Sequence, residues 1–512
     1  MLSWIVFIPV VVGLIGFLLP ARVVGWWALL GSLVSLGLAI ALVAGFDAAG
    51  GALQDVVDRS WIPQLGVRYQ LGVDGLSLFL VLLTSVLWAA TVLWSALQHP
   101  DRPRNYFFML GLAQTATLGA FLAQDLLLFV LFFDLMLIPF YFLIGQWGTG
   151  DRIRATIKMI IYTLIGSLLM LVAAIATAVL SADAVGQVTF SIETLRQFPL
   201  PAGSQYWIFA FFSLAFLIKM PAFLVHGWIV DAYKACPLPV LALLSGVLSK
   251  VAAYGFLRIV MPVLPDAAIH FQDVLLIIAL ASILYGSAMA FTHPDIRLIA
   301  AYSSVAQMGF ITLGIFSLSS TGGDGSVIQM VNHGLVIAPV FLIVAIIAER
   351  SGTEDIREMG GMARHAPVLA ALFIIVTMAL LAIPGSANFV GEYFILQGVF
   401  ETKVAIAVVA SVGIALAAFY ALRMYQQTMH DREAAAGVSR EIAFREAIVL
   451  VPLVACIVAL ALYPGLITSR GTDAVDRSLA AVSTDASPPP EALAEGGWTG
   501  YGPPLETAEA PR

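Results

Sequence analysis

Two lysines lie well inside apolar stretches that are long enough to cross a lipid bilayer. Lys219 and Lys250 occupy the adjoining runs AFFSLAFLIKMPAFLVHGWIV and LPVLALLSGVLSKVAAYGFLR. Placing an ammonium group at mid-membrane costs roughly 2.5–3.5 kcal/mol on insertion scales, so such residues usually face a polar interior or an ion path. An apolar setting disfavours the charged form of an amine, which lets a lysine there take up and release a proton near neutral pH. The two positions therefore predict a proton relay.

Two carboxylic acids are placed as deep in apolar stretches as these lysines. They are Asp134 in LLLFVLFFDLMLIPFYFLIG and Glu392 in NFVGEYFILQGVF. We expect Asp134 to pair with Lys219, because opposite charges stabilise each other in a low dielectric. Lys250 would pass the proton on, and Glu392 would accept it at the end of the line. The alternative is a set of buried structural ion pairs, since such networks also perturb titration.

Two histidines extend this predicted relay. His226 stands in the sequence HGW just after Lys219, and His333 stands in VNHGLVIAPV. Imidazole titrates near neutral pH and is suited to proton transfer, although a membrane histidine is also found as a hydrogen-bonded packing residue. The other five histidines are expected in loops or at the ends of spans: His99, His270, His293, His365 and His430.

No cofactor and no metal are predicted on this chain. Its two cysteines, Cys236 and Cys456, are far apart in the sequence and show no metal-ligand or redox spacing. No ligand pattern for a flavin, a haem or an iron–sulfur cluster is present in the sequence. Electron transfer on this chain is therefore not expected.

The composition excludes an ordinary soluble globular domain. The chain has 512 residues, of which 60% are hydrophobic and 11% are charged, and its mean hydropathy is +0.96. The net charge of −7 is partly carried by an acidic C-terminal stretch, so we expect no nucleic-acid partner. The chain must instead reside in a lipid bilayer.

Counting about 20 apolar residues for each crossing, the sequence predicts an all-α polytopic membrane protein with about fourteen transmembrane helices. They are expected at 2–19, 23–46, 73–97, 105–123, 125–147, 155–181, 205–230, 238–261, 272–292, 296–318, 325–349, 367–397, 402–430 and 441–465. Lys and Arg concentrate in the loops after odd-numbered spans, and short cytoplasmic loops collect these residues. Both termini are therefore expected on the outer face of the cell (inner) membrane.

Proline interrupts two of the expected spans. Pro221 follows Lys219 closely, and Pro384 with Gly385 divides the span that carries Glu392. Proline removes a backbone donor, so the helix must open there, and paired broken helices are typical of transporters built from inverted repeats. We expect two inverted five-helix repeats, spans 4–8 and 9–13, with the interrupted helix fourth in each. The predicted units are residues 1–104 (spans 1–3), 105–262 and 263–430 (the repeats), 431–467 (the last span) and 468–512 (a polar, disordered tail).

A family resemblance is carried by residues 219–260, which read KMPAFLVHGWIVDAYKACPLPVLALLSGVLSKVAAYGFLRIV. This segment resembles the signature region of the antiporter-like subunits of respiratory complex I, a family shared with multisubunit cation/proton antiporters and membrane-bound hydrogenases. Further matches are FFDLMLIPFYFLIGQWG, IRLIAAYSSVAQMGF, VNHGLVIAPVFLIVAIIAER, DIREMGGMARHAP and PGSANFVGEYFILQGVF. The chain looks most like the M-type members, because Glu392 stands where the L- and N-type chains carry lysine.

The resemblance implies a role for each deep ionisable group. It implies that Asp134 and Lys219 form a pair between spans 5 and 7, that Lys250 is the central relay lysine, and that Glu392 is the exit group. His333 matches the family histidine of span 11. Two positions depart from the family pattern: Asp134 replaces a usual glutamate, which lengthens the reach to Lys219 or requires a bridging water, and Gln307 replaces a usual histidine.

The resemblance also implies a proton-translocating membrane-arm subunit of a proton-pumping NADH:quinone oxidoreductase. NADH, flavin, iron–sulfur clusters and quinone would then be bound by partner subunits, and the L-type and N-type antiporter-like chains would be its membrane neighbours. Two alternatives remain open at this point. One is a subunit of a cation/proton antiporter or a membrane-bound hydrogenase, and the other is a structural membrane scaffold without a relay.

Overall fold

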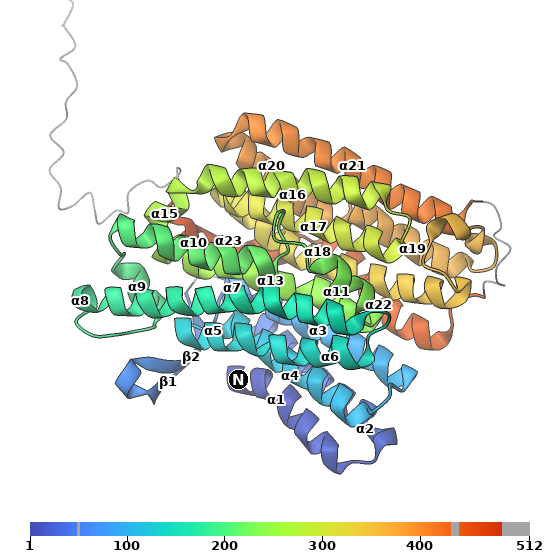
Figure 1. Ribbon diagram of the computed structural model, residues 1–512, viewed down its shortest axis with the longest axis horizontal. Helices are drawn as coiled ribbons and strands as arrows, with labels where there is room; N and C mark the ends of the chain where they lie inside the picture. The colour runs from blue at the N-terminus through green and yellow to red at the C-terminus, as the bar shows by residue number, and fades with distance from the viewer. Residues whose placement is uncertain (49–51, 432–439, 484–512) are drawn as a thin grey trace, which may run out of the picture.

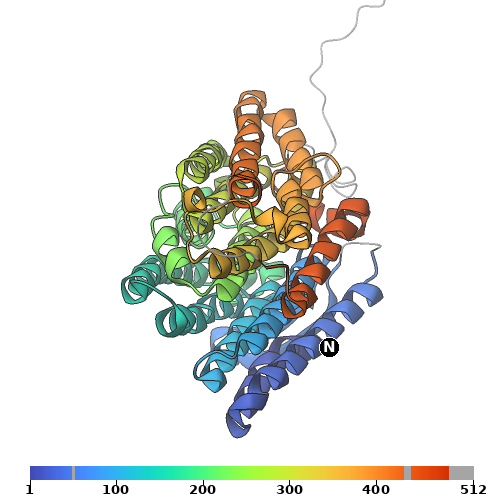
Figure 2. The same cartoon turned by 90° about the vertical axis from the view of Figure 1, so that its right-hand side faces the viewer.

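The computed structural model describes residues 1–48, 52–431 and 440–483, and the description below refers to these residues. Long helices lie side by side along one axis, as Figure 1 shows, and the end-on view of Figure 2 shows them packed as a bundle. Eleven helical segments are long and apolar enough to cross a membrane. The predicted all-α membrane fold is confirmed.

The bounds of these eleven segments follow the predicted spans closely. They are α2 (Ala21–Gly45), α3 (Gly75–Gln98), α5 with α6 (Leu126–Leu135 and Leu137–Trp147), α7 (Arg152–Leu180), α10 (Ala202–Lys219), the continuous segment from α12 to α14 (Leu238–Val263), α16 (Gln272–Thr292), α17 (Ile296–Ile315), α18 (Ser320–Ser351), α21 (Val404–Met429) and α22 (Phe444–Leu462).

Helices also occupy the three other predicted spans. They are α1 (Leu2–Ile15), α4 (Pro103–Leu122), and the pair α19 (Pro367–Leu380) and α20 (Ala387–Thr402). Helix α1, even with the turn η1 (Gly16–Leu18), and helix α19 are apolar but short. Helix α4 has ample length but carries polar side chains such as Gln114 and Thr115 in its buried half.

Both predicted helix interruptions are present. Helix α10 ends at Lys219, and the chain resumes helical geometry only at α11 (Ile229–Ala235). The intervening turn contains Pro221 and places Leu224 at a φ of 77°. The second interruption separates α19 from α20, with Ala382 at a φ of 54° and Gly385 at 90°. A missing proline donor and left-handed residues end both helices in the middle of a span.

The segment that carries Lys250 is helical throughout but changes its pitch twice. It consists of α12 (Leu238–Leu243), the π-helical turn η3 (Leu244–Leu248), α13 (Ser249–Gly255), the π-helical turn η4 (Phe256–Val260) and α14 (Met261–Val263). Turns of π-helix are rare and are found mostly at functional sites. The sequence analysis did not predict them.

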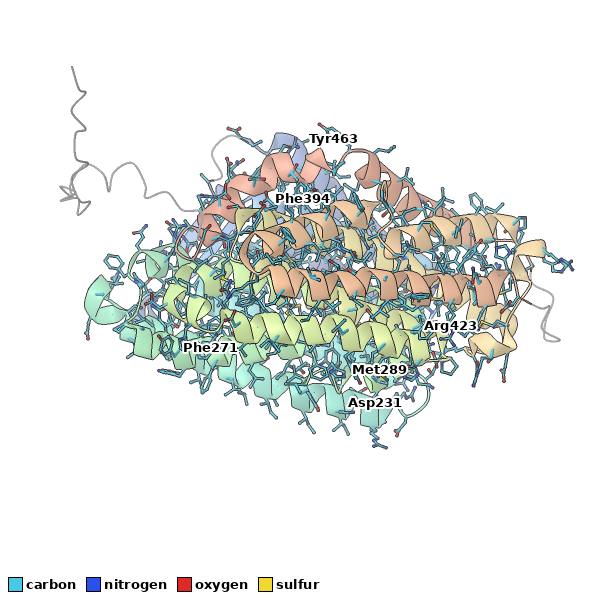
Figure 3. All side chains as sticks on the ribbon, turned by 90° about the horizontal axis from the view of Figure 1, so that it is seen from above. Asp231, Phe271, Met289, Phe394, Arg423 and Tyr463 are labelled. Atoms are coloured by element: carbon cyan, nitrogen blue, oxygen red, sulfur yellow. The ribbon has the colours of Figure 1, made fainter. Side chains whose placement is uncertain are left out.

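Three central segments are almost wholly buried, whereas the outer ones face the surroundings. The α12 to α14 segment and α17 are buried along their whole apolar windows and α18 along 94%, but α2, α21 and α22 are buried along only 33%. Figure 3 looks onto the surface that α16 and α21 form, with Met289 and Arg423 toward one end and Phe271 toward the other. The polar side chains discussed below lie mostly on the buried central segments.

The two ends of the bundle differ in structure (Figure 1). One end, here the hairpin end, carries the antiparallel strands β1 (Gln54–Ile62) and β2 (Val67–Val73) joined by η2 (Pro63–Leu65), and the short helices α8 (Ala182–Val185), α9 (Ile192–Gln197) and α15 (Pro265–His270). The opposite end, here the charged-loop end, carries residues 148–151, 293–295 and 352–366, including the turns η5 (Ile356–Glu358) and η6 (Met362–Arg364).

The predicted disorder from residue 468 is wrong for the first part of that stretch. Residues Gly465–Leu479 form helix α23, which packs against α18 and α3 at the hairpin end. Its polar composition conceals an amphipathic pattern, because Ile467, Ala474, Val475 and Leu479 are buried while Asp473 and Asp476 are exposed. Residues 484–512 of the predicted tail lie outside the described residues.

The order of helices agrees with the predicted five-helix units. The first would run from α4 to α14 and the second from α16 to α21, and in each the interrupted helix is the fourth span. The exact boundaries of the units stay a prediction.

Candidate functional site

Lys219 is buried, but it does not form the predicted ion pair with Asp134. Its Nζ donates a long hydrogen bond of 3.4 Å to the Phe133 carbonyl and lies 4.5 Å from the centre of the Phe133 ring. The Asp134 carboxylate is half-buried beside Ser167 of α7, and its Oδ1 has no hydrogen-bond partner among the described residues. The two side chains are neighbours that interact through their charges without touching.

A local break in the helix positions Asp134. Helix α5 ends at Leu135, and α6 begins at Leu137. Pro139 lacks the N–H that would bond the Leu135 carbonyl, so the helical ladder is interrupted just after Asp134. Asp134 therefore lies at the end of a helix within the span, as Lys219 lies at the end of α10.

A small cavity connects Lys219 with the helix that carries Lys250. It has a volume of about 20 Å³, and its lining includes Lys219, Thr163, Tyr233 and Ser249. This volume is enough for about one water molecule, and the lining offers the polar partners that a buried water needs. Ser249 directly precedes Lys250. The cavity therefore separates Lys219 from the residue that precedes Lys250, and Lys250 itself does not line it.

Lys250 and His333 form a buried pair at the centre of the bundle. The Nζ of Lys250 lies 2.8 Å from Nδ1 of His333 and donates a hydrogen bond of 2.6 Å to the Ser245 carbonyl, and neither the lysine nor the histidine is exposed. Ser245 lies in the π-helical turn η3, whose wider pitch alters the regular ladder and leaves its carbonyl available to Lys250. The local backbone thus holds one side of the lysine, and the histidine of α18 holds the other.

A glycine contact brings these two helices together. A Cβ atom on Gly334 would lie 2.5 Å from the Gly246 carbonyl oxygen, a distance that only glycine permits. Gly334 follows His333 directly, and Gly246 follows Ser245. The close approach of the backbones therefore sets the short distance between Lys250 and His333.

Glu392 ends the line in a cluster of amides. Gln307 Nε2 of α17 donates to Glu392 Oε1 at 2.8 Å, and Gln329 Nε2 of α18 donates to Gln307 Oε1 at 2.7 Å. Glu392 is only 2% exposed, and its other oxygen has no hydrogen-bond partner among the described residues. The glutamine that departs from the family pattern is thus in direct contact with the predicted exit group.

Helix α18 joins the Lys250 pair to the Glu392 cluster. Gln329 and His333 are four residues apart on this helix and therefore lie on one face, about one turn from each other. Between them and Glu392, several buried polar atoms have no hydrogen-bond partner in the described part of the chain: His333 Nε2, Gln329 Oε1, Asn332 Oδ1, the Asn388 amide and Tyr420 Oη. Buried polar groups are rarely left unpaired, so this region is suited to bridging water molecules.

His226 lies apart from this line. It is half-buried in the first interruption, with its ring centre 4.9 Å from Tyr285 and 6.1 Å from Phe223. No hydrogen bond between described residues joins it to Lys219. The structure therefore brings Lys250 and His333 into contact and places them on the same buried helix face that leads to Glu392. Lys219 lies across a small cavity from Ser249, Asp134 lies beside Lys219 without contact, and His226 lies apart.

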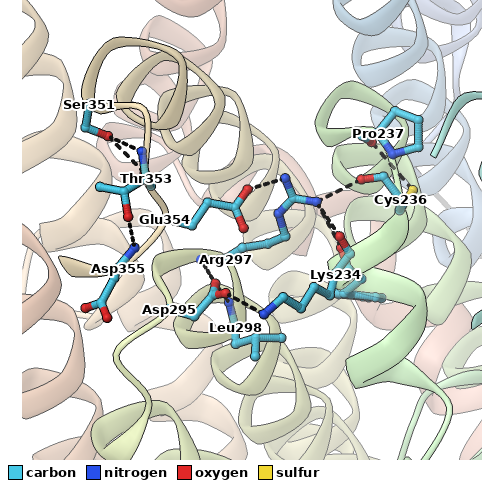
Figure 4. A network of polar contacts seen from close by, with 11 residues as sticks. Lys234, Cys236, Pro237, Asp295, Arg297, Leu298, Ser351, Thr353, Glu354 and Asp355 are labelled. Atoms are coloured by element: carbon cyan, nitrogen blue, oxygen red, sulfur yellow. Dashed lines mark hydrogen bonds and ion pairs between the residues drawn. The ribbon is translucent and has the colours of Figure 1, made fainter. Parts of the chain in front are cut away.

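A second polar network ties the interrupted helix of the first half to the second half at the charged-loop end (Figure 4). Arg297, at the start of α17, donates to the carbonyls of Lys234 at 2.8 Å and Cys236 at 3.1 Å and pairs with Glu354. These carbonyls belong to the end of α11, where helical partners are missing. Lys234 also pairs with Asp295 at 3.4 Å.

Several residues of the site were missed by the sequence analysis. Gln329, Asn332 and Asn388 line the region around Glu392, and Ser245 supports Lys250. Their signal was present, because side-chain amides are rare in apolar spans and VIQMVNHG holds two of them. No group of three or more His, Cys, Asp or Glu side chains suited to a metal ion occurs among residues 1–48, 52–431 and 440–483.

Comparison with known proteins gives consistent matches. Residues 123–417 match the family described as NADH:quinone oxidoreductase/Mrp antiporter, TM. NADH-quinone oxidoreductase subunit M of Rhodobacter capsulatus is 36% identical over 459 residues, covering 86% of this chain and 88% of the relative. The protein of the same name from Escherichia coli is 35% identical over 496 residues, covering 93% and 97%.

Solved structures have the same fold. A chain of respiratory complex I from Thermus thermophilus with bound NADH superposes with a TM-score of 0.87 at 30% identity, covering 94% of this chain and all of that one. A chain of the Mrp complex from a Dietzia species superposes with a TM-score of 0.81 at 22% identity, covering 94% and 99%. The latter likeness is one of fold alone.

Proposed function

Since the chain belongs to the NADH:quinone oxidoreductase/Mrp antiporter membrane family, we propose that it is a proton-translocating membrane-arm subunit of a proton-pumping NADH:quinone oxidoreductase. The observation that supports this most is the buried pair of Lys250 and His333, 2.8 Å apart. Ionisable side chains inside a membrane are costly and usually mark a proton or ion path. The relatives named subunit M match this chain over most of their length, which favours this complex over an antiporter.

The proton would move along the buried polar region in three stages. Lys219 would load from the side of Asp134 and pass its proton across the cavity that Ser249 lines. Lys250 would receive it and hand it to His333, whose ring nitrogen is already within hydrogen-bond distance. From His333 the proton would reach Glu392 along the polar face of α18. A change in the distance between Asp134 and Lys219 would start the sequence, because it alters how strongly the carboxylate holds the lysine's proton.

The redox reaction would take place elsewhere in the complex. NADH, flavin, iron–sulfur clusters and quinone are assigned to partner subunits, and this chain would convert a signal from them into proton movement. Its neighbours would be the L-type and N-type antiporter-like chains. The outward-facing helices, such as α7 with exposed Ile157, Ile161 and Leu168, would meet lipid or these neighbours.

The chain would lie in the cell (inner) membrane with both termini outside. In this orientation the charged-loop end faces the cytoplasm, because basic residues gather there: Arg152 and Arg154 in the first turn of α7, and Arg357 in the loop before α19. The hairpin end would face outward, and proton movement from Lys219 toward Glu392 would end on that side.

Replacing each central lysine in the assembled complex tests this function. In proteoliposomes, Lys219→Ala and Lys250→Ala should clearly lower NADH-driven acidification per NADH oxidised, because removing a proton-transfer group slows the transfer step by about a hundredfold or more. Lys403→Ala is the matched control, because Lys403 pairs with Asp273 at the surface. Unchanged pumping in both central variants would mean that the chain is a structural scaffold, and pumping that requires Na⁺ would favour the antiporter function.

A further inference from the structure

A buried ion pair lies between Lys250 and the hairpin end. Arg258 Nη2 donates to Asp74 Oδ1 at 2.5 Å, and the two side chains are only 12% and 2% exposed. Arg258 Nε also donates to the Tyr254 hydroxyl at 2.9 Å. Near the end of a span, an arginine can reach toward water, but this one is held inside the protein by two buried partners.

Arg258 lies on the same face of its helical segment as Lys250. Lys250, Tyr254 and Arg258 follow one another at intervals of four residues, so they lie along one face of the same helical segment. Eight residues of helix correspond to a rise of about 12 Å. Tyr254 is fully buried between the two cations. Arg258 therefore lies between Lys250 and the hairpin end along this helix face.

A polar pocket opens on the far side of Arg258. It has a volume of about 40 Å³, and its lining includes Asp74, Gln124, Glu193, Arg196, Arg258 and Arg477. Glu193 is exposed, so the pocket reaches the surface, while Asp74 and Arg258 form its inner wall. Water can therefore approach the ion pair from the hairpin end, and Lys250 lies behind it.

Asp74 is a rigid anchor for the arginine. It caps α3 by accepting hydrogen bonds from the backbone N–H groups of Leu76 and Ser77, at 3.2 and 3.3 Å. The helix α3 thus fixes the position of the Asp74 carboxylate, and the carboxylate in turn holds Arg258. A guanidinium stays charged at any physiological pH, and a fixed arginine in a narrow passage repels protons.

We propose that Asp74 and Arg258 form an electrostatic gate that prevents protons in the hairpin-end pocket from returning to Lys250. This proposal rests on the function proposed above and adds a direction-setting element to it. The positive charge of Arg258 opposes a second positive charge on the segment between the pocket and Lys250. Asp74 offsets part of this charge, but Arg258 Nε points to Tyr254, on the side of Lys250, so the positive end of the ion pair is the end nearer the lysine. An uncompensated unit charge at about 12 Å and an effective dielectric constant of about 20 would change proton occupancy about tenfold, which is the upper limit of the effect.

Passive proton conductance tests the gate separately from pumping. The whole complex is placed in proteoliposomes without NADH, a K⁺ gradient with valinomycin sets a membrane potential, and the internal pH is followed. Arg258→Gln should raise the conductance by up to about tenfold, whereas Arg258→Lys, which keeps the charge, should conduct no more than the parent complex. Glu193→Gln at the exposed mouth of the pocket is the matched control and should also stay tight.

A double variant shows whether the leak passes through the relay. Combining Arg258→Gln with Lys250→Ala should return the conductance to that of the parent complex. If Arg258→Gln conducts no more protons than the parent complex, or if its extra conductance persists in the double variant, the proposed gate is wrong. Failure of the proposed function would look different, because Lys250→Ala alone would then leave NADH-driven pumping intact.

A double variant without either charge serves as the control for correct folding of Arg258→Gln. Removing one partner of a buried ion pair leaves an uncompensated charge and destabilises a protein, whereas replacing both partners is often tolerated. The combination Asp74→Asn with Arg258→Gln leaves no unpaired charge, and should leak less than Arg258→Gln, in which the Asp74 carboxylate attracts protons, but more than the parent complex. If neither variant assembles although Arg258→Lys does, the pair serves folding and the gate is overturned.

Discussion

The Nζ of Lys250 lies 2.8 Å from Nδ1 of His333, and both side chains are fully buried. At this distance in a low dielectric the two groups cannot both carry a positive charge without a large repulsion. The pair therefore carries no more than one positive charge, and under the proposed function a proton arriving at one group would displace a proton from the other. This contact joins the first half of the chain to the second.

His333→Gln tests the shared proton directly. Glutamine keeps a hydrogen-bonding partner for Lys250 but cannot titrate, so proton transfer at this position should slow by about a hundredfold or more, and pumping per NADH should fall while the complex still assembles. NADH oxidation and internal acidification measured on the same vesicles give the ratio. His365→Gln, in the charged loop, is the control and should pump as the parent does. Full pumping by His333→Gln would show that the amide and water suffice at this position.

Asp134→Glu tests the gap beside Lys219. The added methylene should let the carboxylate reach the ammonium that now lies over Phe133, and form the ion pair that the structure lacks. Pumping should be retained, because a carboxylate remains next to the lysine. Asp134→Asn keeps the size but removes the charge, and should lower pumping. Equal pumping by the two variants would mean that the charge at this position plays no part.

Arg297→Gln tests the link between the halves. This substitution removes the cation that pairs with the partly exposed Glu354 and leaves the last carbonyls of α11 without their donor, which costs roughly 1–3 kcal/mol. Lys234→Gln removes an exposed cation from its pair with Asp295 and should cost about 0–1 kcal/mol. Thermal dissociation of the purified complex should therefore occur at a clearly lower temperature in Arg297→Gln. Equal dissociation temperatures for the two variants would contradict the proposed role of Arg297 in joining the two halves.

The loop carboxylate of Glu441 should contribute a pH-dependent stability. Burial raises the pKa of Glu441, but hydrogen bonds from the N–H groups of Val368, Ile442 and Leu369 outweigh this and hold the pKa below its usual value of 4.5. A lowered folded-state pKa stabilises the protein above the unfolded value, and this contribution is lost as the pH falls below about 4.5 and through the folded-state pKa.

Glu441→Gln should consequently flatten the stability profile in that acidic range. Glutamine can still accept a hydrogen bond at the start of α19, so stability near neutral pH should fall by only about 1 kcal/mol, as for other lost helix caps. Melting temperatures of the complex at several pH values between 3.5 and 7 test this. A profile as steep as that of the parent would assign the acid sensitivity to other carboxylates.

The gap between Asp134 and Lys219 shows the limit of reading pairs from sequence. Both residues were recognised because a charge in an apolar run is conspicuous over about 20 residues. Their contact depends on the length of the two side chains and on where the two helices end, α5 at Leu135 and α10 at Lys219. The sequence therefore predicted the participants but not their geometry.

The ion pair of Asp74 and Arg258 was beyond sequence reasoning for another reason. The two residues are 184 positions apart, and each alone resembles an ordinary residue at the end of a span. Only the packing of α3 against the segment that carries Arg258 encloses both side chains. The roles of Gln329 and Asn332 could not be predicted for the same reason. Only the packing of α18 places their side of the helix against α20, which carries Glu392, rather than against lipid.

By itself, the sequence determined the membrane fold, the two interrupted helices and the identity of the buried ionisable groups. It could do so because span length, proline chemistry and the cost of charge in lipid act over a few neighbouring residues. The tertiary structure decided which of these groups meet, that α23 folds back on the hairpin end, and that Arg258 lies between Lys250 and the pocket at the hairpin end. Those relations depend on the rotation and packing of helices far apart in the chain, which no local pattern records.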